Sequence, residues 1–168
     1  MYDNRTQAGR ELVRQLMEYE SRHPVVLGLP RGGVPVAFEV AQALHAPLDV
    51  FMVRKVGAPT QPELAIAAVA GGDIVARNED AVRYLDIDEE RLAEAIRGEQ
   101  RRLQEQEKRL REGPPIDVEG RDAIIVDDGL ATGATMRAAI RALRQKNPSS
   151  VVAAAPRSEE HTSELQSL

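Results

Sequence analysis

The chain has 168 residues, of which 42% are apolar and 29% charged, a balance typical of one globular domain with a sizeable core. The net charge of −5 argues against a nucleic-acid-binding surface over the whole protein. The absence of cysteine excludes disulfides and thiolate metal sites, and the spacing of His23, His45 and His161 does not suit a metal site.

The beginning of the chain is polar with a helical pattern, unlike a signal peptide, and no apolar run approaches membrane-spanning length. We therefore expect a cytoplasmic enzyme or binding protein that has neither a membrane nor a nucleic acid as its partner. Aromatic residues make up only 3% of the chain, so few rings are available to stack on a flat ligand.

The first part of the chain predicts two helices that alternate with two strands. The first helix is amphipathic and is indicated by Ala8, Leu12, Val13, Leu16 and Tyr19. Residues 25–29 are a β-branched run that predicts a strand, closed by a glycine-rich turn at residues 30–33. A second helix is expected from Val34, and residues 48–54 predict a second strand.

The middle of the chain is more polar. Residues 55–63 are rich in glycine and proline and predict a flexible loop. Residues 64–72 and 73–76 predict a hairpin, although the first segment is also compatible with a helix. Residues 88–112 predict a long helix, which Gly-Pro-Pro ends. Its acidic and basic residues nearly balance, which favours a solvated, ion-paired helix over a partner-binding one.

The last third predicts a strand over residues 123–128, a helix over 134–146 and a strand over 151–155. Strands that alternate with helices, several of them apolar throughout, predict a parallel α/β sheet with right-handed crossover connections. The sequence shows neither an internal repeat nor a second domain.

Residues 124–136 carry the strongest functional signal. A buried strand runs directly into Asp127 and Asp128, and then into the small-residue turn A-T-G-A-T and a helix. Parallel sheets bind ligands at the carboxyl ends of their strands, where a turn without bulky side chains lets backbone amides converge on an anion. The two carboxylates suit hydrogen bonds from the vicinal hydroxyls of a ribose. The alternative is a buried strand that ends in solvated acids before a capped helix, but the full pattern favours a site for phosphate and ribose.

Four apolar residues, Asp-Asp, two spacers and A-T-G-x-T resemble the phosphoribosyl-pyrophosphate motif of the type I phosphoribosyltransferases. The similarity extends over most of residues 2–156, and the segments GLPRGGVPVA and VRKVGAP resemble a loosely characterised bacterial group of that family. The chain lacks the G-K-[ST] of a Walker loop and the G-x-G-x-x-G of a dinucleotide-binding turn. The resemblance implies the type I phosphoribosyltransferase fold, a Rossmann-like parallel sheet flanked by helices.

The resemblance also implies a role for individual residues. Asp127 and Asp128 would bind the ribose 2- and 3-hydroxyls of 5-phosphoribosyl 1-pyrophosphate. The 5-phosphate would be held by Ala131, Thr132, Gly133, Ala134 and Thr135. The loop that contacts pyrophosphate would consist of Pro30, Arg31, Gly32 and Gly33. The expected catalytic cations are Arg31, Arg54 and Lys55.

In this family a nucleophile displaces pyrophosphate from the anomeric carbon, and the protein neutralises charge on the leaving group. The resemblance implies Mg²⁺ as cofactor, held mainly by substrate oxygens and water rather than by protein ligands. Arg54 and Lys55 would lie at a strand end and close over the pyrophosphate. Without the resemblance, this basic pair is more simply read as solvated. For residues 30–33 the alternative is an ordinary strand-to-helix turn, which is the weaker reading from their glycines alone.

Ala131 stands where the family members that use 6-oxopurines carry an aspartate, so this segment is more similar to the adenine-type enzymes. The sequence does not identify the acceptor. The leading hypothesis is transfer of phosphoribosyl to a nitrogenous acceptor. The alternatives are a non-catalytic module that senses the donor, and hydrolysis or phosphoryl transfer on a related sugar phosphate. The Arg54-Lys55 pair favours catalysis, because a sensor has no leaving group to stabilise. The resemblance leaves room for a homodimer.

The sequence pattern at the end of the chain differs from that of the preceding segments. Residues 157–167, RSEEHTSELQS, have no useful period and resemble the translation of a sequencing-library adapter. We therefore expect residues 1–156 to be a phosphoribosyltransferase domain truncated at its C-terminus, and residues 157–168 to be a non-native tail that contributes nothing to the fold. Segments that form part of the family's acceptor-binding hood would then be missing.

Overall fold

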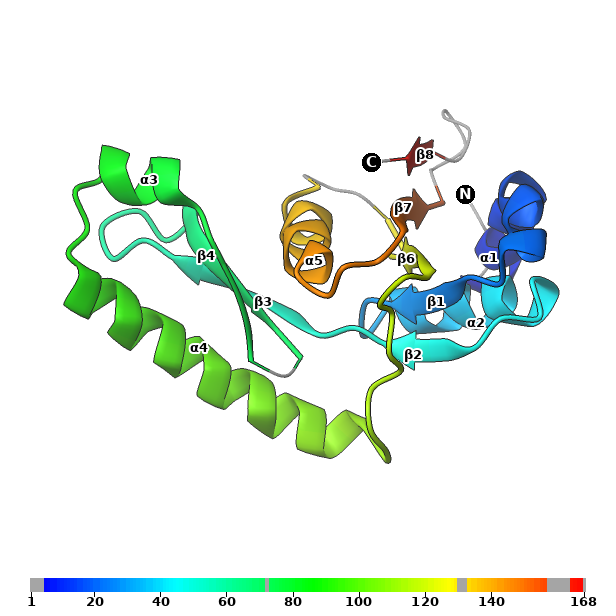
Figure 1. The fold of residues 1–168 in the computed structure, drawn as a ribbon, viewed down its shortest axis with the longest axis horizontal. Coiled ribbons are helices and arrows are strands. Elements are labelled where there is room, and N and C mark those ends of the chain that lie inside the picture. Colours follow the sequence, from blue (N-terminus) through cyan, green and yellow to red (C-terminus); the bar gives the residue numbers. More distant parts are fainter. Residues whose placement is uncertain (1–4, 72, 130–132, 157–163, 168) are drawn as a thin grey trace.

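The computed structural model describes residues 5–71, 73–129, 133–156 and 164–167. Within these ranges it contains a five-stranded sheet in the order β2-β1-β6-β7-β8 and a three-stranded sheet in the order β3-β4-β5 (Figure 1). The strands are β1 (Val25–Gly28), β2 (Leu48–Val50), β3 (Val53–Gly57), β4 (Ala65–Ala70), β5 (Ile74–Arg77), β6 (Asp122–Val126), β7 (Ser150–Ala155) and β8 (Glu164–Ser167). The helices are α1 (Arg5–Leu16), α2 (Gly33–Ala43), α3 (Glu79–Tyr84), α4 (Glu89–Leu110) and α5 (Ala134–Arg144), with a 3-10 helix η1 (Met17–Arg22).

Four strands of the larger sheet run parallel, with β1 between β2 and β6, and β7 on the far side of β6. Neighbouring side chains along each strand are buried on opposite faces, because helices cover both faces of the sheet. On one face, Leu12 of α1 and Val40 of α2 belong to the same buried cluster as Val26 and Ile124. The helix α5 covers the other face (Figure 1). The predicted parallel α/β architecture is confirmed.

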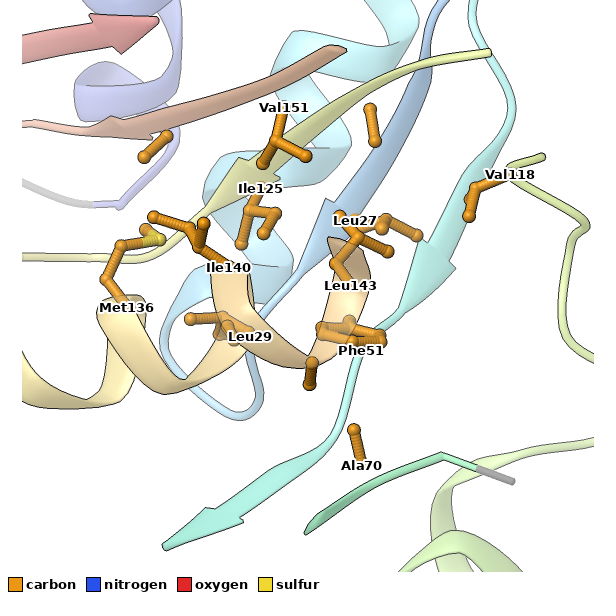
Figure 2. Close-up of a cluster of buried hydrophobic side chains, with 14 of the residues drawn as sticks. Leu27, Leu29, Phe51, Ala70, Val118, Ile125, Met136, Ile140, Leu143 and Val151 are labelled. Carbon is orange, nitrogen blue, oxygen red and sulfur yellow. The ribbon is translucent and has the colours of Figure 1, made fainter. Parts of the chain in front are cut away.

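The helix α5 lies between the two sheets. Its Ile140 and Leu143 belong to the same buried cluster as Leu27 and Ile125 of the parallel sheet (Figure 2). The same cluster includes Ala70 of β4, and α5 also contacts β3 and β5. The helix that follows the predicted phosphate turn, residues 131–135, therefore packs against both sheets.

The strands β3, β4 and β5 form an antiparallel sheet with α4 packed against it. Leu92 and Leu103 of α4 are buried with Ile66 of β4 in one cluster. The helix begins after Asp88, whose carboxylate accepts the backbone N–H of Arg91 at 2.8 Å and caps the first turn. The predicted hairpin and the predicted long charged helix are both confirmed.

One predicted strand is divided between the two sheets. The sequence predicts a single strand over residues 48–54, but β2 and β3 are separate strands with Phe51 and Met52 between them. Phe51 is buried in the cluster beneath α5 and Met52 in the cluster beneath α4, so the chain changes sheets at this point. Because β3 continues through Lys55, it also takes up the beginning of the loop predicted at residues 55–63. An apolar run does not distinguish one strand from two when both sheets bury its side chains.

The end of the chain also differs from the prediction. Residues 157–168 were expected to add nothing to the fold, but β8 pairs antiparallel with β7, for example at Ala153 and Gln166. Without β8, β7 would be the edge of the sheet, and the free N–H and C=O groups of an edge strand pair readily with an extended segment. Such pairing needs no side-chain period, which is why the sequence pattern did not reveal it. The non-native origin of the tail is a separate prediction that the fold does not test.

Candidate functional site

The loop after β1 and the segment after β6 meet because their strands are parallel neighbours. Leu29 N donates to Val126 O at 2.9 Å, and Gly33 N donates to Leu29 O at 2.9 Å. A Cβ built on Gly33 would lie 2.5 Å from Val126 O, and one built on Gly32 would overlap the carboxylate of Asp128. At Gly33 only glycine permits this close approach, because the neighbouring atoms belong to the backbone, whereas at Gly32 the neighbour is the end of the Asp128 side chain. The structure thus brings together the segments that the sequence assigns to pyrophosphate and to ribose.

Asp127 and Asp128 are consecutive but differ in environment. Asp127 is half-buried, and its Oδ1 accepts the backbone N–H of Asp128 at 2.8 Å, whereas Asp128 is exposed. Burial is the main cause that raises the pKa of Asp127 to about 6; the hydrogen bond from the Asp128 backbone opposes the rise, and the Asp128 carboxylate adds to it. Two adjacent oxygen acceptors of this kind suit vicinal hydroxyls or a hydrated divalent cation.

The predicted phosphate turn is described in part, since Ala131 and Thr132 lie outside the described residues. Gly133 has a left-handed φ of 74° and is the N-cap of α5, which begins at Ala134. Thr135 is exposed in the first turn of the helix. The first-turn N–H groups of α5 therefore lie at the same edge of the sheet as the aspartates, where they can attract an anion.

The tip of the loop formed by residues 30–33, the glycine loop, is accessible to solvent. Arg31 is exposed, Pro30 is half-buried, and the peptide bond between them is cis. Arg31 O accepts the backbone N–H of Val34 at 3.3 Å, so the loop leads directly into α2. The predicted pyrophosphate loop is therefore open to a ligand beside Asp128.

Lys55 belongs to β3 of the antiparallel sheet and lines a cavity beside α5. Its exposed side chain lines a cavity of about 270 Å³ between α5 and the antiparallel sheet, together with Ala134. Arg137 and Arg141 line the same cavity. The sequence reasoning missed both arginines, although their spacing of four residues places them on one face of the helix that follows the phosphate turn.

Arg54 does not join Lys55 at this cavity. Its Nε lies 2.7 Å from Glu99 Oε2 on α4, on the opposite face of β3. The Arg54 side chain is 34% exposed and that of Glu99 18% exposed, so the ion pair is partly shielded from water. The structure therefore separates two residues that the sequence assigned to one task.

A larger cavity, of about 450 Å³, lies at the opposite end of α5. Phe51, Leu143 and the ion-paired Asp49 and Arg111 line it, and the predicted site residues do not. Among the described residues, no cluster of three or more histidine, aspartate or glutamate side chains could hold a metal ion. No helix in those ranges is long and apolar enough to cross a membrane.

The sequence profile of the phosphoribosyl transferase domain matches residues 1–165. The chain belongs to the phosphoribosyltransferase family. Two Mycobacterium tuberculosis proteins, described as candidate phosphoribosyl transferases, are each 46% identical over 157 residues, which cover 93% of this chain and 35% of theirs. The chain therefore spans about a third of the length of these curated phosphoribosyltransferase relatives.

Solved structures show the same fold. The crystal structure of a Thermus thermophilus protein is 43% identical with a TM-score of 0.83, and the match covers 92% of this chain and 74% of that one. A purine phosphoribosyltransferase from Pyrococcus horikoshii has a TM-score of 0.52 at 19% identity, over 89% of this chain and 70% of that one. The second likeness shows the fold alone. The type I phosphoribosyltransferase fold implied by the sequence motif is confirmed.

Proposed function

We propose that the protein binds 5-phosphoribosyl 1-pyrophosphate with Mg²⁺ and transfers the phosphoribosyl group to a nitrogenous acceptor, releasing pyrophosphate. The observation that carries this proposal is the contact between the glycine loop and the paired aspartates, where Gly32 lies against the Asp128 carboxylate. A loop that is open to pyrophosphate and two carboxylates that can accept hydrogen bonds from ribose hydroxyls therefore lie at one edge of the sheet. Family membership supports the same reaction class.

In the proposed reaction, an acceptor nitrogen attacks the anomeric carbon as the bond from that carbon to the pyrophosphate oxygen breaks. Asp127 and Asp128 accept hydrogen bonds from the ribose hydroxyls and so fix the ring. Backbone amides around Gly32 and Gly33 and the guanidinium of Arg31 take up the pyrophosphate charge. Lys55 acts from β3, where it lines the cavity beside α5 and can offset charge as pyrophosphate leaves.

The residues of this site fit a hydrated Mg²⁺ ion. Asp127 and Asp128 offer carboxylate oxygens, the ligand type that Mg²⁺ prefers, and leave most of its coordination to water and substrate oxygens. When bound, the ion would supply charge neutralisation between pyrophosphate and the ribose hydroxyls. Asp127 can bind Mg²⁺ in this way only when its carboxyl is ionised. Because the pKa of this carboxyl is raised to about 6, binding of 5-phosphoribosyl 1-pyrophosphate with Mg²⁺ should depend on pH near that value.

In this proposal the role of Arg54 is structural and not catalytic. It holds α4 against β3 through Glu99, and it leaves Lys55 as the cation that this strand presents to the cavity. The charged donor is retained inside cells because phosphates do not cross membranes unaided, so we place the reaction in the cytoplasm.

A screen for pyrophosphate release tests the proposal, with the donor, Mg²⁺ and a panel of nucleobases and small amines. We expect turnover with at least one acceptor, and loss of both turnover and donor binding when Asp127 and Asp128 are both changed to asparagine. Calorimetric binding of the donor without turnover on any acceptor would favour the sensing module. Unchanged affinity in the double variant would refute the site.

A further inference from the structure

The cavity between α5 and the antiparallel sheet is lined by cations among small residues. Lys55 lies on its strand side, and Arg137 and Arg141 lie on its helix side. Most of the remaining lining consists of alanine from β4, β5 and α5, and Glu63 is the one acid among the described residues that line the cavity. Small side chains leave the space open, and the excess of positive charge favours an anionic occupant.

Arg137 is the cation of this group that touches the phosphate turn. A Cβ built on Gly133 would lie 3.0 Å from Arg137 Nη1, so the guanidinium is folded back over the glycine at the beginning of α5. The backbone reinforces this proximity, since Arg137 N donates to Gly133 O at 2.9 Å. Arg141 lies one turn farther along the helix on the same cavity wall, and Gly133 has no corresponding contact with it.

We propose that Arg137 is the residue that selects a phosphorylated sugar, by binding the 5-phosphate of the donor from the cavity side. This inference rests on the proposed function. The guanidinium presents several N–H donors in one plane and matches two oxygens of a phosphate monoester, which a backbone turn alone binds less selectively. Lys55 adds positive charge from the opposite wall of the cavity.

The beginning of α5 is compatible with a bound anion. The first turns of α3 and α4 carry acids, Glu79 and Asp80 in one and Glu89 and Glu90 in the other, whereas those of α1, α2 and α5 carry none. The first turn of α5 has no acid, and a cation, Arg137, is its fourth residue.

The test uses the full chain and titrates it with ribose 5-phosphate and, separately, with magnesium pyrophosphate. Arg137→Ala is expected to weaken ribose 5-phosphate binding by about tenfold or more, the effect of losing a charge-assisted hydrogen bond. Affinity for magnesium pyrophosphate should stay the same, because that ligand occupies the glycine loop. In steady-state assays the KM for the donor should rise while kcat changes little. Arg137→Lys should recover part of the affinity, since it keeps the charge but not the planar fork.

Arg141→Ala is the matched control, since it removes an equal charge from the same cavity wall without a contact to Gly133. It should weaken ribose 5-phosphate affinity much less than Arg137→Ala does. Equal weakening by both variants would show a general charge effect and overturn the role of Arg137. Unchanged affinity in Arg137→Ala, with the donor still bound by the wild type, overturns this inference alone. A wild-type protein that binds neither probe overturns the proposed function together with it. Melting temperatures and the Arg137→Lys variant separate loss of binding from loss of fold.

Discussion

Arg54 and Lys55 are consecutive in the sequence, yet their side chains lie on opposite faces of β3. Arg54 pairs with Glu99 on α4 at 2.7 Å, whereas Lys55 lines the cavity beside α5. The alternation of side chains along a strand requires this separation. One residue therefore attaches a helix, and the other is free to serve the proposed site.

The two residues should respond differently to substitution. Lys55→Ala should lower kcat by about tenfold or more, because its charge is needed most when pyrophosphate departs, and should change the melting temperature little. Arg54→Ala should cost about 1 kcal/mol of stability, or about 2–4 °C in melting temperature for a chain of this size. Glu99 keeps a contact with Arg102 at 2.8 Å, which limits that loss.

Pyrophosphate release and thermal denaturation of both variants check this pair of expectations. If Lys55→Ala raises only the KM for the donor, then Lys55 docks the substrate and does not act on the leaving group. If Arg54→Ala loses turnover with its stability intact, the original assignment of Arg54 to catalysis is right.

Local patterns were sufficient for most of the fold. The apolar run at residues 123–126 and the charged helix over 88–112 were predicted because each pattern is decided within its own segment. The division of residues 48–54 was not predictable, because it depends on Phe51 and Met52 entering two different cores. The pairing of Arg54 with Glu99, 45 positions later, is likewise invisible without the tertiary fold.

The glycine loop offers a second prediction. Gly32→Ala should weaken donor binding, because the added methyl group takes the place of the Asp128 carboxylate and turns that side chain out of the position proposed to bind ribose. Gly113→Ala is the matched control, since a Cβ built there meets nothing within 4 Å. Calorimetry with the donor should show full affinity in the control. Normal affinity in Gly32→Ala would mean that the loop and the aspartates do not form one site.

The pKa of Asp127 predicts a conflict between stability and function. Burial raises this pKa from 3.8 to about 6, so the folded state binds the proton more tightly than the unfolded state. The contribution of this carboxyl to stability is therefore fully present below pH 3.8 and is lost as the pH rises through about 6. Asp127→Asn should melt at a higher temperature than the wild type at pH 7.5, and the difference should shrink toward pH 4.

Donor affinity should change in the opposite sense, falling in the wild type below about pH 6 as Asp127 becomes protonated. Asp127→Asn should have weak affinity at every pH. Melting curves and donor titrations between pH 4 and 8 check both statements, with Glu105→Gln on the exposed surface of α4 as the control. A wild-type melting temperature that always equals that of Asp127→Asn would contradict the burial of an ionised carboxylate.

The candidate site was predictable where residues follow one another and less so where they meet in space. Asp127, Asp128 and the glycine loop are each contained in a short motif, and the parallel pairing of β1 and β6 brings them together. Arg137 was missed because the motif was read as ending at the turn, whereas its contact with Gly133 follows from the first turn of α5. Arg137 lies four residues after Gly133, a spacing that places the two one helical turn apart.

The end of the chain provides the last prediction. Deleting residues 157–168 removes β8 and exposes the N–H and C=O groups of β7, whose residues Val151 to Ala155 are buried and apolar. We expect a lower melting temperature and concentration-dependent aggregation, because an apolar edge strand pairs with other chains. Gln166→Pro should reproduce part of the effect, since proline lacks the N–H that a strand ladder uses. Differential scanning calorimetry and light scattering check both variants, with Gln166→Thr as the control that retains the N–H. If the deletion leaves the melting temperature and the scattering unchanged, β8 does not stabilise the sheet, and the expectation from the sequence, that this tail adds nothing to the fold, is right.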